Sequence, residues 1–195
     1  MITLEEAEQQ LSEIDSLPFT IPLLGWSPVI KGAFAGMPKR SWVFSGARAR
    51  IGAILRGSSV QRLADPLAGA KPYKIAPSSS HPARRCLQAV GTAIHTQTPT
   101  LCIIADAALA QGAFTQALDL AGTHNAPIIF LVIRFPLDQE GSPLVAQSNA
   151  DLSSLCASYH IAFTDVQPQE DAIKHHIELA CQSHTPSLIQ TILEK

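Results

Sequence analysis

Residues 128–133 read Ile-Ile-Phe-Leu-Val-Ile, an uninterrupted apolar run that decides the fold. A strand with one face in water alternates apolar and polar residues, whereas this run has no polar member. Both of its faces must therefore be covered, as in parallel sheets that have helices on either side. The run predicts an α/β fold with a mostly parallel central sheet and helices on both faces.

Strand-like and helical stretches alternate on both sides of this run. The expected order is strand, helix, strand, helix, strand, helix, strand, over residues 101–105, 111–123, 128–133, 148–159, 161–166, 170–182 and 188–193. Right-handed crossovers join strands in this order, and such sheets bind ligands beyond the carboxyl ends of their strands. We therefore expect function in the loops that begin at Asp106 and Arg134.

The N-terminal half is less regular. Thr3 and Glu6 have the spacing of a capping box and predict a first helix that Pro18 ends. Proline and glycine residues in residues 19–38 indicate an irregular connector around a brief helix.

Helical patterns follow the connector. Two short helices are expected to meet at Gly57, and another helix is expected over residues 83–95 after an exposed loop at residues 69–82. We predict two parts, namely an N-terminal helix and connector over residues 1–30 and the core over residues 31–195.

Composition excludes several classes of partner. The net charge is −2 and there is no run of lysine or arginine, so no nucleic-acid or membrane surface is predicted. Acidic residues Glu5, Glu6 and Glu8 stand where an export signal would be basic, which predicts a cytoplasmic protein. Only 15% of residues are charged, which fits either an alanine-padded core or a surface covered by another chain.

Common catalytic motifs are absent from the sequence. No Gly-x-Gly-x-x-Gly follows a strand, and there is no Gly-x-x-x-x-Gly-Lys-Ser/Thr, Gly-x-Ser-x-Gly or His-Glu-x-x-His pattern. The cysteines form no Cys-x-x-Cys pair, which favours reduced, buried thiols over a disulfide framework or a zinc site: Cys86, Cys102, Cys156 and Cys181. Asp106 follows a buried strand, and its carboxylate is expected either to bind a divalent metal or to cap the next helix.

Residues 102–135 are similar to a segment of the alpha subunit of thiamine-diphosphate-dependent 2-oxoacid dehydrogenases, of the pyruvate dehydrogenase type. The shared features are a strand that ends in Gly-Asp-Gly, a helix that starts with Gln-Gly, and a strand that begins after proline and ends in Asn-Asn. Residues 41–57 and 87–93 resemble two upstream segments of that family, and residues 161–166 and 185–191 its last two strands. The resemblance covers residues 31–195 and implies the thiamine-diphosphate-binding fold.

The resemblance implies a cofactor site that is altered here. Asp106 stands at the family's magnesium-binding position, and Arg48 at an arginine that contacts the cofactor diphosphate. Arg134 and Phe135 replace the Asn-Asn pair, which removes an oxygen ligand of magnesium. The other departures are Ala105 and Ala107 for the two glycines, Ala47 for a tyrosine and Arg50 for a histidine.

A degenerate, non-catalytic relative is the function that these departures favour, with no bound cofactor. The chain ends at Lys195, before the segment in which the family has an active-site histidine, and no catalytic residue is predicted. The family binds its cofactor between chains, so we expect a homodimer or a beta-subunit-like partner. The alternative is an active decarboxylating subunit that uses thiamine diphosphate and magnesium and is completed by a partner.

The arginines leave a further alternative open. Arg48, Arg50 and Arg134 could together bind a small phosphate or carboxylate without metal, because guanidinium groups bind such anions bidentately. The competing expectation, which we prefer, is that Arg134 pairs with Asp106 and fills the emptied metal position.

Overall fold

The computed structural model describes residues 2–13, 23, 25–64, 74–77, 81–135 and 151–193. The helices are α1 (Leu4–Ser12), α2 (Ser27–Gly36), the 3-10 helix η1 (Ala49–Arg56), α3 (Val60–Leu63), α4 (Pro82–Thr96), the 3-10 turn η3 (Asp106–Ala108), α5 (Gly112–Thr123), α6 (Leu152–Ser158) and α7 (Glu170–Ser183). The strands are β1 (Val43–Phe44), β2 (Thr100–Ala105), β3 (Ile128–Arg134), β4 (Ala162–Asp165) and β5 (Ser187–Ile192).

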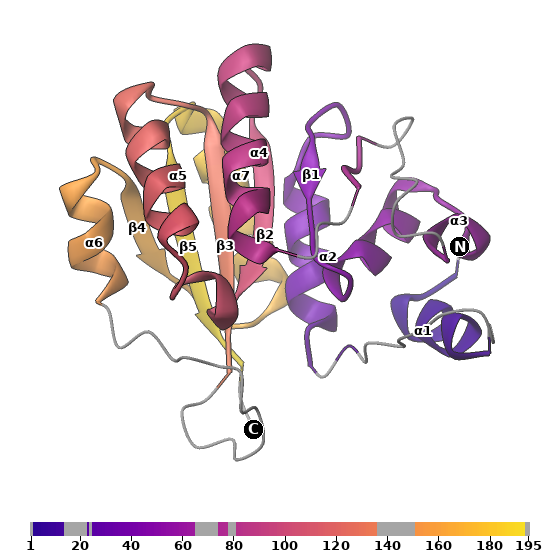
Figure 1. Cartoon of the computed structure of the whole chain (residues 1–195). Coiled ribbons are helices and arrows are strands. Elements are labelled where there is room, and N and C mark those ends of the chain that lie inside the picture. The colour runs from indigo at the N-terminus through magenta and orange to yellow at the C-terminus, as the bar shows by residue number, and fades with distance from the viewer. Residues whose placement is uncertain are drawn as a thin grey trace.

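The strands form one parallel sheet in the order β1-β2-β3-β5-β4. Helices α4, α5 and α6 cover one face, and α2 and α7 cover the other (Figure 1). This arrangement confirms the α/β fold and the parallel sheet that the apolar run predicts.

Alternating side chains of the central strands divide the core into two halves. In β3, Ile129, Leu131 and Ile133 face α2, η1 and α7, whereas the intervening residues Phe130 and Val132 face α4 and α5. All of them are buried. The absence of polar alternation in this run thus reflects two apolar layers on one strand.

Two glycines allow helices α2 and α7 to pack closely. A Cβ atom on Gly32 would lie 2.3 Å from the carbonyl oxygen of Glu170, and one on Gly36 would lie 2.7 Å from that of Lys174. Both distances are far shorter than a van der Waals contact, so the space between the backbones admits no methyl group at either glycine.

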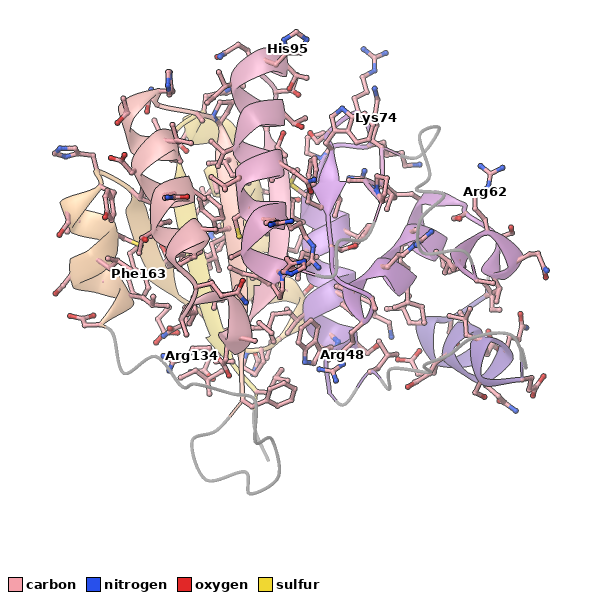
Figure 2. The ribbon with its side chains drawn as sticks, viewed as in Figure 1. Arg48, Arg62, Lys74, His95, Arg134 and Phe163 are labelled. Atoms are coloured by element: carbon pink, nitrogen blue, oxygen red, sulfur yellow. The ribbon has the colours of Figure 1, made fainter. Side chains whose placement is uncertain are left out.

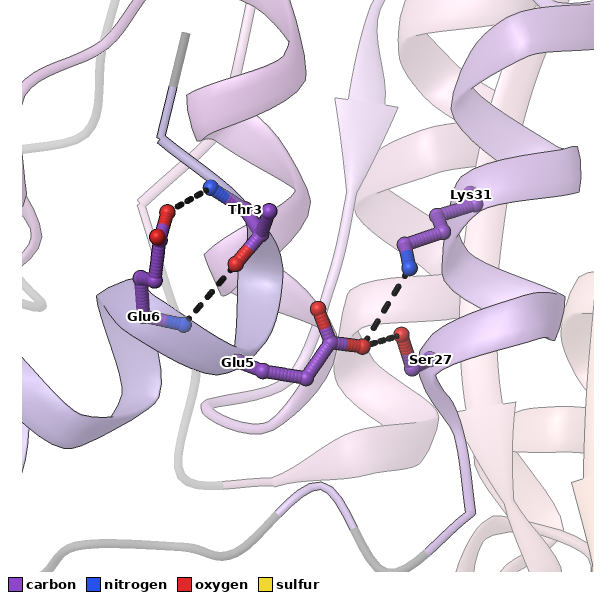
Figure 3. A network of polar contacts seen from close by, with 5 residues as sticks. All are labelled: Thr3, Glu5, Glu6, Ser27 and Lys31. Atoms are coloured by element: carbon purple, nitrogen blue, oxygen red, sulfur yellow. Dashed lines mark hydrogen bonds and ion pairs between the residues drawn. The ribbon is translucent and has the colours of Figure 1, made fainter.

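Helix α1 is capped and is tied to α2 by polar contacts (Figure 3). The Thr3 hydroxyl accepts from the N–H of Glu6, and the Glu6 carboxylate accepts from the N–H of Thr3 at 2.7 Å, as the capping box predicts. The Glu5 carboxylate accepts from the Ser27 hydroxyl and lies 3.2 Å from Lys31 Nζ. These contacts lower the pKa of Glu5, chiefly through Ser27.

Most expected elements are present. The brief helix expected within the connector at residues 19–38 is α2, of ten residues, and it spans residue 30, where the sequence predicts the division into two parts. Strand β1, of two residues, was not predicted. Helices η1 and α3 do meet at Gly57, whose φ is 94°. Much of the expected loop at residues 69–82 lies outside the described residues, as do residues 14–22 and 136–150.

Two further observations concern the cysteines and the helices. All four cysteines are free and buried. In the part of the chain that the structure describes, no helix has both the length and the apolar character that a membrane crossing requires.

Candidate functional site

Asp106 lies at the carboxyl end of β2, where the sequence predicts a site. Its Oδ1 lies 3.3 Å from Arg134 Nε, and its Oδ2 accepts from the backbone N–H of Phe135 at 3.1 Å. The side chains of Asp106 and Arg134 are 9% and 18% exposed. The ion pair expected between Asp106 and Arg134 is therefore present, and both carboxylate oxygens have partners within the chain.

Asp106 does not cap a helix. The N-cap of η3 is Ala105 and that of α5 is Gln111, and neither helix has a side-chain cap. The capping role considered for Asp106 is therefore wrong, because its carboxylate turns across the sheet edge towards β3.

Burial and pairing act on the charge of Asp106 in opposite directions. Desolvation raises the pKa of this carboxyl above its ordinary value, while the Phe135 N–H and the Arg134 guanidinium lower it in part. The net shift is upward. The loss of hydration thus destabilises the charged carboxylate more than its contacts with Phe135 and Arg134 stabilise it.

Gln190 extends the ion pair towards the third central strand. Arg134 Nη1 donates to Gln190 Oε1 at 3.2 Å, so Arg134 bridges β2 and β5 from the end of β3. Gln190 is buried in β5, between Ile189 and the buried Thr191. The sequence analysis did not predict a role for this residue. A glutamine between Ile189 and Thr191 in a buried strand does indicate a buried polar contact.

Arg48 lies next to this cluster and is held by two aromatic rings. Its guanidinium carbon lies 4.9 Å from the Trp26 ring centroid and 5.5 Å from that of Phe135. The two rings contact each other, with centroids 6.3 Å apart. Figure 2 shows Arg48 and Arg134 at the same end of the molecule. Trp26 was also missed, because a single tryptophan in an irregular connector follows no periodic pattern.

Arg50 does not share the aromatic contacts of Arg48. It is buried, and its Nη2 donates to the carbonyl oxygen of Arg62 in helix α3 at 3.4 Å. The cluster of three arginines considered from the sequence therefore reduces to Arg48 and Arg134, which Phe135 connects.

The residues present do not fit a magnesium diphosphate. Both oxygens of Asp106 already accept a hydrogen bond within the chain, and neither a guanidinium nor a phenyl ring supplies the further oxygen ligands that a hard cation needs. Among the residues that the structure describes, no group of three or more His, Cys, Asp or Glu side chains is placed to hold a metal ion.

No family model matches this chain, and no curated protein matches it. Among solved structures, a proposed thiamin diphosphate-dependent enzyme from Mycobacterium smegmatis matches 85% of the chain at 18% identity, with a TM-score of 0.60. Benzoylformate decarboxylase from Polynucleobacter necessarius matches 85% at 13% identity, with a TM-score of 0.58.

The chain spans 31% and 32% of the lengths of these two structures. The narrower likeness to the alpha subunit of a 2-oxoacid dehydrogenase stays a prediction. At these identities the likeness concerns the fold alone, and the chain has the α/β fold found in thiamin diphosphate-dependent enzymes.

Proposed function

We propose that this chain is a non-catalytic relative of the alpha subunit of 2-oxoacid dehydrogenases that keeps its fold for assembly. The partner is a second copy of the chain or a protein like the beta subunit of that family. One observation carries the proposal: the Arg134 guanidinium and the Phe135 N–H occupy both oxygens of Asp106. The carboxylate that would hold the metal of a cofactor is thereby committed to the chain's own residues.

The geometry supports a structural role for Asp106. The ion pair joins the ends of β2 and β3, and Gln190 connects it to β5, so internal contacts link three strands at the edge where ligands bind in open parallel sheets. A buried ion pair that loses one partner leaves an uncompensated charge. Freeing Asp106 for a metal would therefore leave the partly buried Arg134 side chain with only Gln190 as a partner in the described structure.

Composition supports the assembly role. Only 15% of residues are charged, and interface cores are depleted in charged residues. The resemblance to the alpha subunit implies a cofactor bound between two chains. A surface that once enclosed a cofactor between subunits can remain as an interface after its ligands are lost.

Calorimetry tests the non-catalytic part of the proposal. We expect no binding heat when thiamin diphosphate and Mg²⁺ are titrated into the chain at concentrations of about 1 mM. Saturable binding that disappears in the Asp106→Ala variant would overturn the proposal and support the alternative, an active decarboxylating subunit. The titration is repeated with a beta-subunit-like partner present. Binding seen only in this mixture would show that the cofactor site needs both chains.

Light scattering during size exclusion tests the assembly part. We expect a mass above that of one 20.9 kDa chain, either for the chain alone or when it is mixed with a beta-subunit-like partner. The mass of a monomer at every protein concentration, with and without the partner, would contradict assembly. The calorimetric test of cofactor binding does not depend on this result.

A further inference from the structure

Two of the four buried cysteines lie next to each other in the core. Cys86 belongs to helix α4 and Cys102 to strand β2, on the face of the sheet that α4 covers (Figure 1). The Cys102 thiol donates to Cys86 Sγ, and the two sulfurs are 3.9 Å apart. For Cys156 and Cys181 no contact with another cysteine is found among the described residues, and the sulfur beside Cys181 is that of Met37.

The sulfurs of Cys86 and Cys102 are close enough for a disulfide to form by side-chain rotation. A disulfide bond is about 2.05 Å long, so the two sulfurs must approach each other by about 2 Å. Rotation about the Cα–Cβ bond of a cysteine moves its sulfur without moving the backbone. Helix α4 and strand β2 can therefore keep their packing when the bond forms.

Burial makes this pair slow to react and protects the product of a first reaction. Both cysteines are 0% exposed. Desolvation raises the pKa of Cys102, and the neighbouring Cys86 raises it further. Because the thiolate is the reactive form, only a small oxidant reaches and oxidises such a pair, and it does so slowly. Once one sulfur is oxidised, the nearest nucleophile is the other sulfur.

A buried guanidinium lies beside the two sulfurs. Arg85 Nη1 donates to the carbonyl oxygen of Ile103, the residue that follows Cys102, at 3.3 Å. The charge of Arg85 attracts a thiolate at either cysteine and lowers the pKa of Cys102 in part. A cation is therefore in place to stabilise the negative charge when one thiol loses its proton.

We propose that Cys86 and Cys102 are a redox modification site, which a hydroperoxide converts into a reversible disulfide that ties α4 to β2. One thiolate attacks the peroxide, so that a sulfur–oxygen bond forms, the oxygen–oxygen bond breaks, and a sulfenic acid and water result. The second thiolate then attacks the sulfenic sulfur, the sulfur–oxygen bond breaks, and the oxygen leaves as water. In total, two thiols lose two electrons and two protons, and one hydrogen peroxide becomes two waters.

Peptide mapping tests the cross-link on the unchanged chain. Trypsin releases residues 86–134 as one peptide that contains Cys86 and Cys102, while Cys156 and Cys181 fall in two other peptides. The reduced, folded chain is treated with excess hydrogen peroxide, quenched with catalase, unfolded, alkylated with iodoacetamide and digested. We expect peptide 86–134 to carry no alkyl group and to be two hydrogens lighter than its dithiol form. Cys156 and Cys181 should both be alkylated.

Variants assign the reaction to the pair. Cys86→Ala removes one member, and we expect it to abolish the loss of two hydrogens. Cys156→Ala is the matched control, because Cys156 is equally buried and lies outside the pair, and we expect it to form the cross-link at the rate of the unchanged chain. Far-ultraviolet circular dichroism establishes that each variant folds, and Cys102→Ala replaces Cys86→Ala if the latter does not.

Thermal unfolding measures what the bond does to the fold. The disulfide closes residues 87–101 into a loop and thereby restricts the unfolded chain. We expect the midpoint of unfolding of the oxidised chain to rise by about 5 °C or more and to return to its original value in dithiothreitol. Peroxide should not raise the midpoint of Cys86→Ala.

Three results would overturn the proposal. They are alkylation of both Cys86 and Cys102 after peroxide treatment, sulfinic acid in place of the disulfide, and an oxidised chain whose midpoint does not rise. A cross-link that forms only when the chain is treated in urea would also contradict it, because the folded packing would then not bring the sulfurs together. Since Asp106 takes no part, these results do not alter the tests of cofactor binding and assembly.

Discussion

Asp106 and Arg134 join the carboxyl ends of β2 and β3, with Arg134 Nε 3.3 Å from Asp106 Oδ1. The backbone N–H of Phe135, the next residue, holds the other carboxylate oxygen. Two consecutive residues at the end of one strand thus satisfy a carboxylate at the end of its neighbour. They are also the residues that stand where the family resemblance implies an Asn-Asn pair.

Removing Arg134 tests the contribution of this pair to stability. Arg134→Ala leaves the carboxylate of Asp106 buried with only the Phe135 N–H, and we expect the free energy of unfolding to fall by about 1–3 kcal/mol. The measurement is urea denaturation followed by circular dichroism. Lys174→Ala is the matched control, because its ion pair with Glu178 is exposed, and we expect a change within about 0.5 kcal/mol.

A double-mutant cycle separates pairing from side-chain loss. If the ion pair is formed, Asp106→Ala combined with Arg134→Ala costs less than the sum of the single changes, since neither charge is then left alone. Additive losses at the two positions would contradict the pair.

The close packing of α2 on α7 gives a second prediction. We expect Gly32→Ala to lower the free energy of unfolding by about 1–3 kcal/mol, because the added methyl group would overlap the Glu170 carbonyl. Gly91→Ala is the control in helix α4, where an added Cβ meets nothing within 4 Å. Higher helix propensity should stabilise this variant by about 0.5–1 kcal/mol. Equal effects of the two changes would contradict the packing.

Asp106 gives a prediction about pH. The pKa of this carboxyl is raised in the folded protein above its ordinary value, mainly by desolvation, so the folded chain binds this proton more tightly than the unfolded chain. The stability that this group contributes is therefore fully present below the unfolded pKa and is lost as pH rises through the folded pKa.

The comparison with Asp106→Asn isolates this group. We expect the free energy of unfolding of the parent chain, relative to the variant, to increase as the pH falls from about 7 to about 4. Urea denaturation across this range measures it. A relative decrease would mean that pairing with Arg134 outweighs desolvation.

Thiol reactivity gives a further prediction. All four cysteines are buried, and burial raises the pKa of Cys156 to about 12 and that of Cys181 to about 11. Thiolates are the reactive species, so we expect Ellman's reagent to react slowly with the folded chain at about pH 8 and with four thiols in urea. Rapid labelling of the folded chain would contradict the buried positions.

The central sheet could be predicted from the sequence because its signals are local. The run at residues 128–133 has no polar member, and burial of alternate residues in two apolar layers explains why. Strand β1 escaped prediction because two residues, Val43 and Phe44, are too few to display a period, and its pairing with β2 depends on tertiary structure.

The site could be predicted only in part. Asp106 and Arg134 follow or end strands, and parallel pairing brings such positions to one edge, so their contact could be expected. The contact of Trp26 with Arg48 and the burial of Arg50 depend on how α2 and η1 pack. No local sequence pattern predicts either of them. Gln190 could be recognised only as a large amide side chain within a buried strand.

Electron paramagnetic resonance of Mn²⁺, a substitute for Mg²⁺, tests the central claim most directly, because free and bound Mn²⁺ give different signals. With thiamin diphosphate present, we expect adding the chain to leave the Mn²⁺ signal unchanged, since Arg134 and Phe135 occupy the oxygens of Asp106. Loss of the free signal in proportion to added protein, abolished by Asp106→Ala, would contradict the account.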